Sequence, residues 1–365
     1  MACLFDYIKW RGDLDFSESP FNPVDNIILS QLSYLTLDGI VPGPEGKTGI
    51  SIALAVRVFK ERLKEGSIKL TSVFKEDPEL IKALGASRRF GNCQLFGYVN
   101  FIDTIREIQF SAVCITTGKG CFVVFRGTDS SLVGWKEDFN MCFRDVIPSQ
   151  LEAVKYLENM SPMIKGKFRI GGHSKGGNLA IFAASKCRRK IQKRIIEIYS
   201  NDAPGFNEKF ISSAGFLAIK DRLRIYVPQS SIIGMFMEHG SSLNIIKSSE
   251  SGLMQHCLYS WEVTHNSLVS ADKATVSSIF INKTIREWVN NNDYEHREQF
   301  IEALYYIFNA AEVKSISELE NSWFSTAGRV LKSLNNIDES TRKFISKTII
   351  ELFRTAGRNI NTLLH

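Results

Sequence analysis

One segment limits the fold of this chain more than any other: residues 168–184 read FRIGGHSKGGNLAIFAA. A short apolar run ends at paired glycines, a serine follows at position 174, and helical periodicity begins directly after it. A buried strand that turns sharply into a helix is the repeating unit of parallel sheets. The segment therefore predicts an α/β fold in which Ser174 lies at a turn between a strand and a helix.

Strand and helix patterns alternate on both sides of this segment, which predicts a mostly parallel central sheet built from βαβ units. The turn sequence TGKG at 117–120 separates two runs of alternating apolar residues, so we expect a hairpin there. The expected strands are 94–103, 107–116, 121–127, 168–172, 195–200, 223–228 and 244–249, with helices at 149–160 and 177–192.

Both ends of the chain are helical by periodicity. Apolar residues recur at helical spacing in 24–37 and 50–65, and beyond about residue 270 the strand pattern disappears. We therefore expect three parts: a helical lead-in over 1–85 that packs on the core, an α/β core over 86–270, and a C-terminal helical appendage over 271–365.

The composition is that of an ordinary globular protein. Of the 365 residues, 44% are hydrophobic and 23% are charged, and a net charge of +6 is modest for this length, so no nucleic-acid partner is expected. The sharpest basic run, KCRRKIQKR at 186–194, could attract an anionic membrane but is more typical of a solvated helix end. Seven scattered cysteines without a CxxC pair or a Cys/His cluster indicate a reduced compartment and no structural metal.

Nothing in the sequence predicts membrane insertion. The N-terminus, MACLFDYIKWRGDLDF, lacks the apolar middle segment of a signal peptide, and no stretch reaches the roughly 18 uncharged apolar residues of a membrane span. We expect a cytoplasmic protein. Peripheral membrane contact stays open, because the last helical segment has apolar residues along one side, although such a side more often packs on the protein's own core. These residues are Phe344, Ile345, Ile349, Leu352 and Phe353.

The run from Gly172 to Gly176 fits the pattern G-x-S-x-G, in which the serine occupies a strained turn and acts as a nucleophile. A side chain at either glycine would collide with the neighbouring strand or helix. The helix that follows begins with unpaired N–H groups and the positive end of its dipole, which suit a developing oxyanion. Its position between a strand and a helix favours Ser174 as a nucleophile over a small residue in a tight turn.

Two further motifs indicate a family. The sequence FRGT at 125–128, followed by W-x-x-D-F and the GHSxGG turn, resembles the class 3 lipases of the α/β-hydrolase superfamily. More closely, GWKEDFN, GGHSKGGNLA, QSSIIG and SxxSGLMQH look like the bacterial Mbeg-like family of lipase-like hydrolases. The resemblance covers roughly residues 1 to 270. It implies an α/β-hydrolase fold with added N- and C-terminal helical segments and a cofactor-free hydrolase.

The resemblance also implies roles for residues around the serine. The backbone N–H of Thr128, with its hydroxyl as a further donor, and the backbone N–H of Lys175 would form the oxyanion hole. Asp138 falls where class 3 lipases have an aspartate that supports the oxyanion loop, so we assign it a supporting role. Trp135 is interpreted as a packing residue rather than a substrate contact.

A serine hydroxyl needs a histidine to take its proton and an acid to orient that histidine. The chain order Ser, acid, His in this fold excludes His173 as the base and leaves it a supporting role, while His296 and His365 lie in the helical tail. The lipase pattern expects the histidine in the loop after the last core strand, and the local sequence QHCLYSW matches the Mbeg-like family, so we predict His256. The alternatives, in order, are His265 and His239.

The acid departs from the class 3 pattern. Those lipases have an aspartate after the strand equivalent to 223–228, where this chain has Ser230 and Ser231. Asp202 follows the preceding strand at the carboxyl edge where α/β active sites assemble, so we predict it as the acid, with a turn-capping role as the alternative. Glu238, Glu250 and a Ser174–His256 dyad without an acid stay open.

The expected activity is hydrolysis of acyl esters, carboxylic or lipid, through an acyl-enzyme on Ser174. The segment SIIGMFM at 231–237, with Phe206, Phe210 and Phe216, could line an acyl pocket, although such residues more often form core. Thioesters, amides and phospholipids are alternative substrates. A non-catalytic scaffold that binds a ligand or partner is the alternative function, because the aspartate of the usual position is absent.

Overall fold

The computed structural model of the chain comprises two compact units. The first contains residues 1–101, 110–127 and 148–275, and the second contains 102–109, 128–147 and residues from 276 onward. The division expected at residues 85 and 270 stays a prediction. The described residues are 1–46, 48–67, 74–129, 132–141, 144–250, 252–292, 295–296, 339 and 343.

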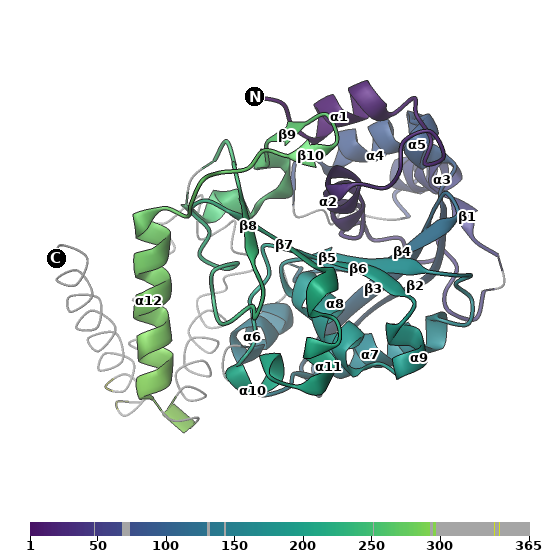
Figure 1. Cartoon of the computed structure of the whole chain (residues 1–365). Helices are drawn as coiled ribbons and strands as arrows, with labels where there is room; N and C mark the ends of the chain where they lie inside the picture. Colours follow the sequence, from purple (N-terminus) through teal and green to yellow (C-terminus); the bar gives the residue numbers. More distant parts are fainter. Residues whose placement is uncertain are drawn as a thin grey trace. The chain divides into compact units, whose positions relative to one another are not determined.

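Within the described residues, eight strands form one central sheet (Figure 1). In chain order they are β1 (Ile50–Ser51), β2 (Gln94–Asp103), β3 (Ile108–Thr117), β4 (Gly120–Phe125), β5 (Phe168–His173), β6 (Ile195–Asn201), β7 (Leu223–Pro228) and β8 (Leu243–Ile246). The strands neighbour one another in this same order, and β4 to β8 are all parallel, while β1 with β2 and β3 with β4 are antiparallel. The predicted α/β fold with a mostly parallel sheet is confirmed.

The strand sequences explain this arrangement. The apolar runs of β3, β4 and β5 are buried almost throughout, as expected for strands covered on both faces. The predicted hairpin is confirmed: Thr117 pairs with Gly120, and Gly118 takes the φ of +63° that a tight turn between strands requires. The last strand is shorter than expected, because the backbone N–H groups of Lys247 and Ser249 bond to Val269 and Ser260 instead.

One face of the sheet is covered by helices that follow β4, β5 and β6 in the chain (Figure 1). They are α7 (Pro148–Met160), α8 (Lys175–Lys186), α9 (Arg189–Gln192), α10 (Glu208–Ile211) and α11 (Ala214–Leu217). Right-handed connections between successive parallel neighbours place such helices on the same face. The single helix predicted over 177–192 is wrong: α8 ends where Cys187 turns extended, with φ −66° and ψ 163°, and α9 follows as a separate turn.

The N-terminal helices cover the opposite face (Figure 1). They are α1 (Leu4–Arg11), α2 (Pro23–Leu32), α3 (Ile52–Lys64), α4 (Asp77–Ala86) and α5 (Arg88–Gly91). Helix α2 packs directly on β4 and β5. Its start is fixed by Asn22, whose side chain accepts bonds from the N–H groups of Val24 and Asp25, and by proline in the first turn. The helix expected over 24–37 therefore exists but ends at Leu32.

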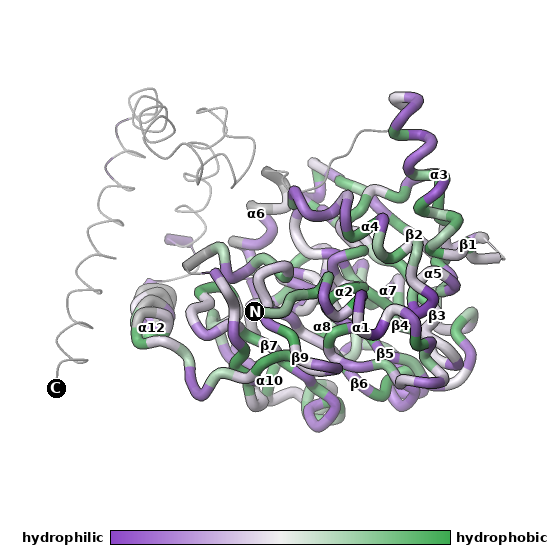
Figure 2. Tube along the Cα trace, turned by 90° about the horizontal axis from the view of Figure 1, so that it is seen from above, coloured by the Kyte–Doolittle hydropathy of each residue, from purple (hydrophilic) through white to green (hydrophobic). Residues whose placement is uncertain are grey.

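A buried ion pair ties this helical layer together. Arg89 donates two hydrogen bonds to the carboxylate of Asp25, at 2.7 and 2.5 Å, and both side chains are fully buried. Burial raises the pKa of Asp25, and hydrogen bonds from Arg89 and Tyr7 oppose that shift. The buried part of this layer ends within α3. Figure 2 shows that this helix changes from hydrophobic to hydrophilic toward its C-terminal end.

The other described elements of the first unit are short and are joined by loops. One 3₁₀ turn, at Lys220–Arg222, comes directly before β7. Two more 3₁₀ turns, at Gly252–His256 and Leu258–Ser260, and a small hairpin of β9 (Val263–Thr264) and β10 (Ser267–Leu268) follow β8. The 3₁₀ turn at Gly252–His256 presents the predicted base.

The second unit contains α6 (Leu132–Met141) and α12 (Val276–Asn291). Most of the helical appendage predicted over 271–365 lies outside the described residues, including Phe344, Ile345, Ile349, Leu352 and Phe353. Two described residues near them, Lys343 and Glu339, form an ion pair at 2.7 Å. In the described part of the chain, every helix is too short or too polar to cross a bilayer.

Candidate active site

The turn between β5 and α8 holds Ser174 in a conformation that L-residues rarely adopt. Its φ is +56° and its ψ is −134°, and its N–H donates to the carbonyl of Asn201 at 2.9 Å. Such a conformation costs on the order of 1–3 kcal/mol and is concentrated at functional sites. The strained strand–helix turn expected from the sequence is therefore present.

The glycines around Ser174 are required by close contacts, as the sequence predicted. A Cβ on Gly172 would lie 2.4 Å from the carbonyl oxygen of Phe125 and 2.4 Å from the backbone of Gly176. A Cβ on Gly176 would lie 2.1 Å from the same oxygen of Phe125. Strand β4 and helix α8 thus approach the turn too closely for any side chain at these two positions.

Two of the predicted residues meet directly. The Nδ1 atom of His256 lies 2.7 Å from Oδ2 of Asp202. Asp202 is 1% exposed, whereas the side chain of His256 is 23% exposed, so the histidine is oriented by a buried carboxylate and still accessible. Asp202 follows the end of β6 with a φ of +48°, and its N–H donates to the carbonyl of Tyr226 at 2.8 Å.

The other oxygen of Asp202 is held by Ser231. The Ser231 hydroxyl donates to Asp202 Oδ1 at 2.5 Å and accepts from the N–H of Gly234 at 2.9 Å. Both carboxylate oxygens therefore bond to side chains elsewhere in the chain rather than to the turn at 201–205. These contacts favour a role in orienting His256 over a role as a cap of the turn. The sequence pattern marked Ser231 only as the place of a missing carboxylate, and its contact with Asp202 was not anticipated.

His173 lies against His256 and is itself held by a residue that the sequence did not point to. Its Nε2 atom lies 2.7 Å from the carbonyl oxygen of His256, and the two ring centroids are 4.3 Å apart. Its Nδ1 atom lies 2.9 Å from the hydroxyl of Tyr34. Burial, and then the charge of His256, lower the pKa of His173. Tyr34 lies in the segment 24–37, where the helical pattern predicts an ordinary core residue.

Gln255, the partner of His256 in the QH motif, clamps the loop that carries the histidine. Its side chain accepts from the N–H of Ser230 at 2.8 Å and donates to the carbonyl of Glu250 at 2.6 Å. Its own carbonyl accepts from the indole of Trp261 at 2.9 Å. The glutamine thus fixes this loop to the end of β7.

The remaining candidates for base and acid lie in other settings. His239 is buried, its Nε2 atom is 2.8 Å from the carbonyl of Gly234, and burial lowers its pKa. His265 is exposed in the turn between β9 and β10. Glu250 is exposed, and Glu238 pairs through its backbone with Phe206.

The predicted oxyanion residues come from both units. In the first unit, Lys175 is the buried first residue of α8. Gly127, the residue before Thr128, lies close to the serine, because a Cβ added to it would be 3.0 Å from Cβ of Ser174. In the second unit, the hydroxyl of Thr128 donates to Asp138 in α6 at 2.6 Å, which is the contact a supporting aspartate would make. The side chain of Trp135 lies outside the described residues.

The predicted acyl-pocket phenylalanines pack on one another. The rings of Phe206 and Phe210 stack with centroids 4.1 Å apart, and Phe216 contacts Phe210 edge-on at 5.8 Å. All three are buried, as is Phe236. The interpretation as core is the one that these contacts support.

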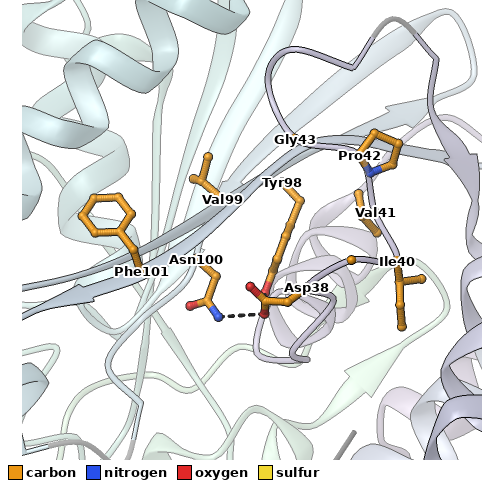
Figure 3. Close-up of a pocket in the computed structure, with 10 residues that line it drawn as sticks. Asp38, Ile40, Val41, Pro42, Gly43, Tyr98, Val99, Asn100 and Phe101 are labelled. Atoms are coloured by element: carbon orange, nitrogen blue, oxygen red, sulfur yellow. Dashed lines mark hydrogen bonds between the residues drawn. The ribbon is translucent and has the colours of Figure 1, made fainter. Parts of the chain in front are cut away.

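An open cavity of 610 Å³ lies beside β2, in the first unit. Figure 3 shows Tyr98 and Asn100 pointing toward Asp38, to which they donate at 3.2 and 2.9 Å. Asn100 also accepts from Arg126 of the FRGT motif at 3.0 Å. None of the residues that line this cavity is a predicted catalytic residue. In the described part of the chain, no group of three or more His, Cys, Asp or Glu side chains is placed to hold a metal ion.

Comparisons with known proteins agree with the resemblance read from the motifs. The profile of the Mbeg1-like family matches residues 84–306, more than half of the chain. No curated protein matches the sequence.

Several lipases of known structure align with this chain. The Rhizomucor miehei lipase–propeptide complex is 15% identical over 53% of this chain, with a TM-score of 0.33, and the match spans 66% of that chain. M37 lipase is 16% identical over 57% of this chain and 68% of its own, with a TM-score of 0.36. Lip2 lipase from Yarrowia lipolytica is 13% identical over 68% of this chain and 82% of its own, with a TM-score of 0.36.

Proposed function

Because the chain belongs to the Mbeg1-like family, we propose that it is a serine hydrolase that cleaves acyl esters through an acyl-enzyme on Ser174. In this proposal His256 is the general base and Asp202 is the acid that orients it. The observation that carries the proposal is the 2.7 Å contact between Nδ1 of His256 and the carboxylate of Asp202. The backbone carbonyl of the same histidine accepts a hydrogen bond from His173, the residue directly before Ser174. The three residues also follow the chain order Ser, acid, His.

The proposed reaction has two halves. The hydroxyl oxygen of Ser174 attacks the ester carbonyl carbon while its proton passes to Nε2 of His256. The tetrahedral intermediate then expels the alcohol, which takes that proton from His256 and leaves the acyl group esterified to Ser174. A water molecule attacks this ester, His256 again takes and returns the proton, and the carboxylic acid leaves. Asp202 keeps the imidazole in the Nδ1–H form and stabilises its charged state.

The developing oxyanion needs donors that are in place before the reaction. The N–H of Lys175 is proposed as one donor, since it lies in the first turn of α8, where backbone N–H groups have no partner within the helix. Thr128 is proposed as the other from the family resemblance, with Asp138 supporting its loop. The loss of one such donor typically lowers kcat by about 100- to 1,000-fold.

The substrate class proposed is an ester with an apolar acyl group. An aromatic series reaches from His173 outward: Tyr34 contacts Phe74 with centroids 5.9 Å apart, and Phe74 contacts Tyr259 at 6.1 Å. Phe74 and Tyr259 are partly exposed, so this series connects His173, through Tyr34, to aromatic rings that offer apolar surface. Lipid esters and thioesters share this apolar acyl part, and they are the alternative substrates.

Labelling by a fluorophosphonate probe, combined with ester hydrolysis, tests the proposal. We expect labelling that disappears in Ser174→Ala, falls strongly in His256→Ala and persists in His265→Ala, which changes an exposed histidine outside the site. p-Nitrophenyl esters of increasing chain length then define the acyl preference. Labelling that survives Ser174→Ala would refute the assignment. A wild-type protein that is neither labelled nor active on any ester would favour the non-catalytic scaffold instead.

A further inference from the structure

We infer that Tyr34 and His173 form a positioning relay that fixes the main chain of His256, with His173 held neutral in the Nε2–H form. This inference rests on the proposed function, and it adds two residues that act through the base rather than on the substrate. The relay runs from the hydroxyl of Tyr34 to Nδ1 of His173, at 2.9 Å, and from Nε2 of His173 to the carbonyl of His256, at 2.7 Å.

The chemistry of the contacts defines where the protons are. The carbonyl oxygen of His256 can only accept, so Nε2 of His173 must carry the hydrogen. A neutral imidazole has only one N–H, so Nδ1 of His173 is an acceptor and the Tyr34 hydroxyl donates to it. Burial of His173, which is 1% exposed, lowers its pKa and so favours this neutral form.

The relay holds His256 at a second place, its backbone carbonyl. Asp202 holds the imidazole of His256 through Nδ1, and His173 holds the backbone of the same residue. His173 is also the residue directly before Ser174, so the main chain of the base is bonded to the strand end that presents the nucleophile. The position of Nε2 on His256, the atom that takes the serine proton, is thereby set from two sides.

The neutrality of His173 matters because of the short distance between the rings. With centroids 4.3 Å apart, a charged His173 would oppose the positive charge that His256 acquires during the reaction. Among the residues that the structure describes, the titratable groups in printed contact with the His173 ring are Tyr34 and His256, and Asp202 bonds to His256. The Tyr34 hydroxyl donates only to the neutral form, because in the charged form Nδ1 carries a hydrogen of its own and the hydroxyl can only accept from it.

Tyr34→Phe tests the relay, with Tyr156→Phe as a matched control. Both tyrosines are 5% exposed, and both hydroxyls make buried hydrogen bonds. The hydroxyl of Tyr156 donates to the carbonyl of Gly97 at 2.8 Å and lies 3.4 Å from Sγ of Cys114, away from the histidines. In Tyr34→Phe we expect kcat to fall about 10- to 100-fold, because small displacements of catalytic groups have effects of this size. KM should change less than about two-fold, since no substrate contact is removed.

The pH dependence separates a relay from a merely structural tyrosine. Without the Tyr34 hydroxyl, neutral His173 loses the donor to its Nδ1 atom and is easier to protonate, so the defect in kcat should deepen as the pH is lowered. The control variant should keep the wild-type profile. A Tyr34→Phe enzyme with the kcat and pH profile of Tyr156→Phe would overturn the inference.

Nitrogen-15 NMR of the histidine side chains reads the relay without turnover. We expect the wild-type His173, identified by the signal lost in His173→Gln, to stay in the neutral Nε2–H form from pH 5 to 9, and to titrate or mix tautomers in Tyr34→Phe. An Nδ1–H form in the wild type would overturn the relay even in an active enzyme. If the wild type proves inactive and unlabelled, the proposed function fails, while this spectrum still decides whether the relay exists.

Discussion

The Oδ2 atom of Asp202 lies 2.7 Å from Nδ1 of His256, although 54 positions separate the two residues in the sequence. The chain has no carboxylate at the position where class 3 lipases have their acid. The carboxylate comes from the end of β6, one strand earlier than the class 3 lipase pattern implies. The loop after β7 still contributes, because Ser231 bonds the second oxygen of Asp202 at 2.5 Å. A triad constrains only the contact between acid and histidine, so the acid can come from a neighbouring strand end.

Asp202→Asn should lower kcat by up to about 10,000-fold with little change in folding, because an amide favours the wrong tautomer of the histidine. The φ of +48° at this position is tolerated by Asn as well as by Asp, so the backbone should keep its shape. Steady-state kinetics on a p-nitrophenyl ester checks this, with Glu250→Gln, an exposed carboxylate, as the control. An Asp202→Asn enzyme that keeps most of its activity would remove Asp202 from the triad.

The acid should be transferable to the loop after β7. Ser231 already touches the carboxylate of Asp202, so in Asp202→Ser combined with Ser231→Asp a carboxylate can approach His256 from the other strand end. We expect the double variant to recover part of the activity that Asp202→Ser loses, roughly ten-fold or more if the triad geometry re-forms. Ser231→Asp alone should be impaired, because two carboxylates would compete in one buried site. A double variant no better than Asp202→Ser would show that the β7 loop cannot supply the acid.

The strain at Ser174 should be measurable as stability. Ser174→Gly relieves the φ of +56°, whereas Ser174→Ala keeps it, so the glycine variant should be more stable by about 1 kcal/mol after the entropy cost of glycine. Both variants are expected to be inactive, and urea unfolding gives the comparison. At Ser185, inside α8, the order should reverse, since glycine in a helix is less favourable than alanine by about 0.5–1 kcal/mol. An equal order at both sites would mean that Ser174 is not strained in solution.

Gly127→Ala should damage the site and the stability together. The added Cβ would lie 2.2 Å from the Tyr34 hydroxyl and 2.6 Å from the carbonyl of His173, so both would have to move. Overpacking of this kind typically costs about 1–3 kcal/mol. Gly120→Ala, at the other end of β4, meets nothing closer than 3.6 Å and should be close to neutral. Thermal unfolding and ester hydrolysis of the two variants check the difference.

Local sequence patterns were sufficient for the strand ends and for the chemistry that follows them. Alternating apolar runs predicted β2 to β4, short apolar runs between helical segments predicted β5 to β7, and the glycines around Ser174 predicted the strained turn. Each feature depends on residues that are adjacent in sequence. Asp202 could be predicted because parallel strands bring their carboxyl ends to one edge, whereas His256 was predicted from the class 3 lipase pattern and the QH motif of the Mbeg-like family. Local patterns predict where along the chain a functional residue lies, and the order of the strands in the sheet then brings such residues close together.

The parts that could not be predicted depend on contacts between distant residues. Tyr34 reaches His173 across 139 positions, and no local pattern marks it as different from a core tyrosine. The helical period continues through 187–192, yet α8 ends at Lys186, since Cys187 takes an extended backbone that periodicity does not encode. The outer half of the strand expected at 244–249 bonds to Val269 and Ser260 instead of extending β8.

The buried histidines should make the folded state sensitive to mild acid. Burial lowers the pKa of His239 from the ordinary 6.5, so the unfolded chain binds a proton more readily than the folded one. Its contribution to stability is therefore fully present above about pH 6.5 and is lost as the pH falls toward the lower pKa of the folded state. Replacing His239 by glutamine, which does not titrate, should flatten the decline of the unfolding free energy between pH 7 and pH 5, as measured by urea unfolding at each pH. His265→Gln, at an exposed position, should leave the slope unchanged, and an equal slope in wild type and His239→Gln would show that His239 does not stay neutral in the folded protein.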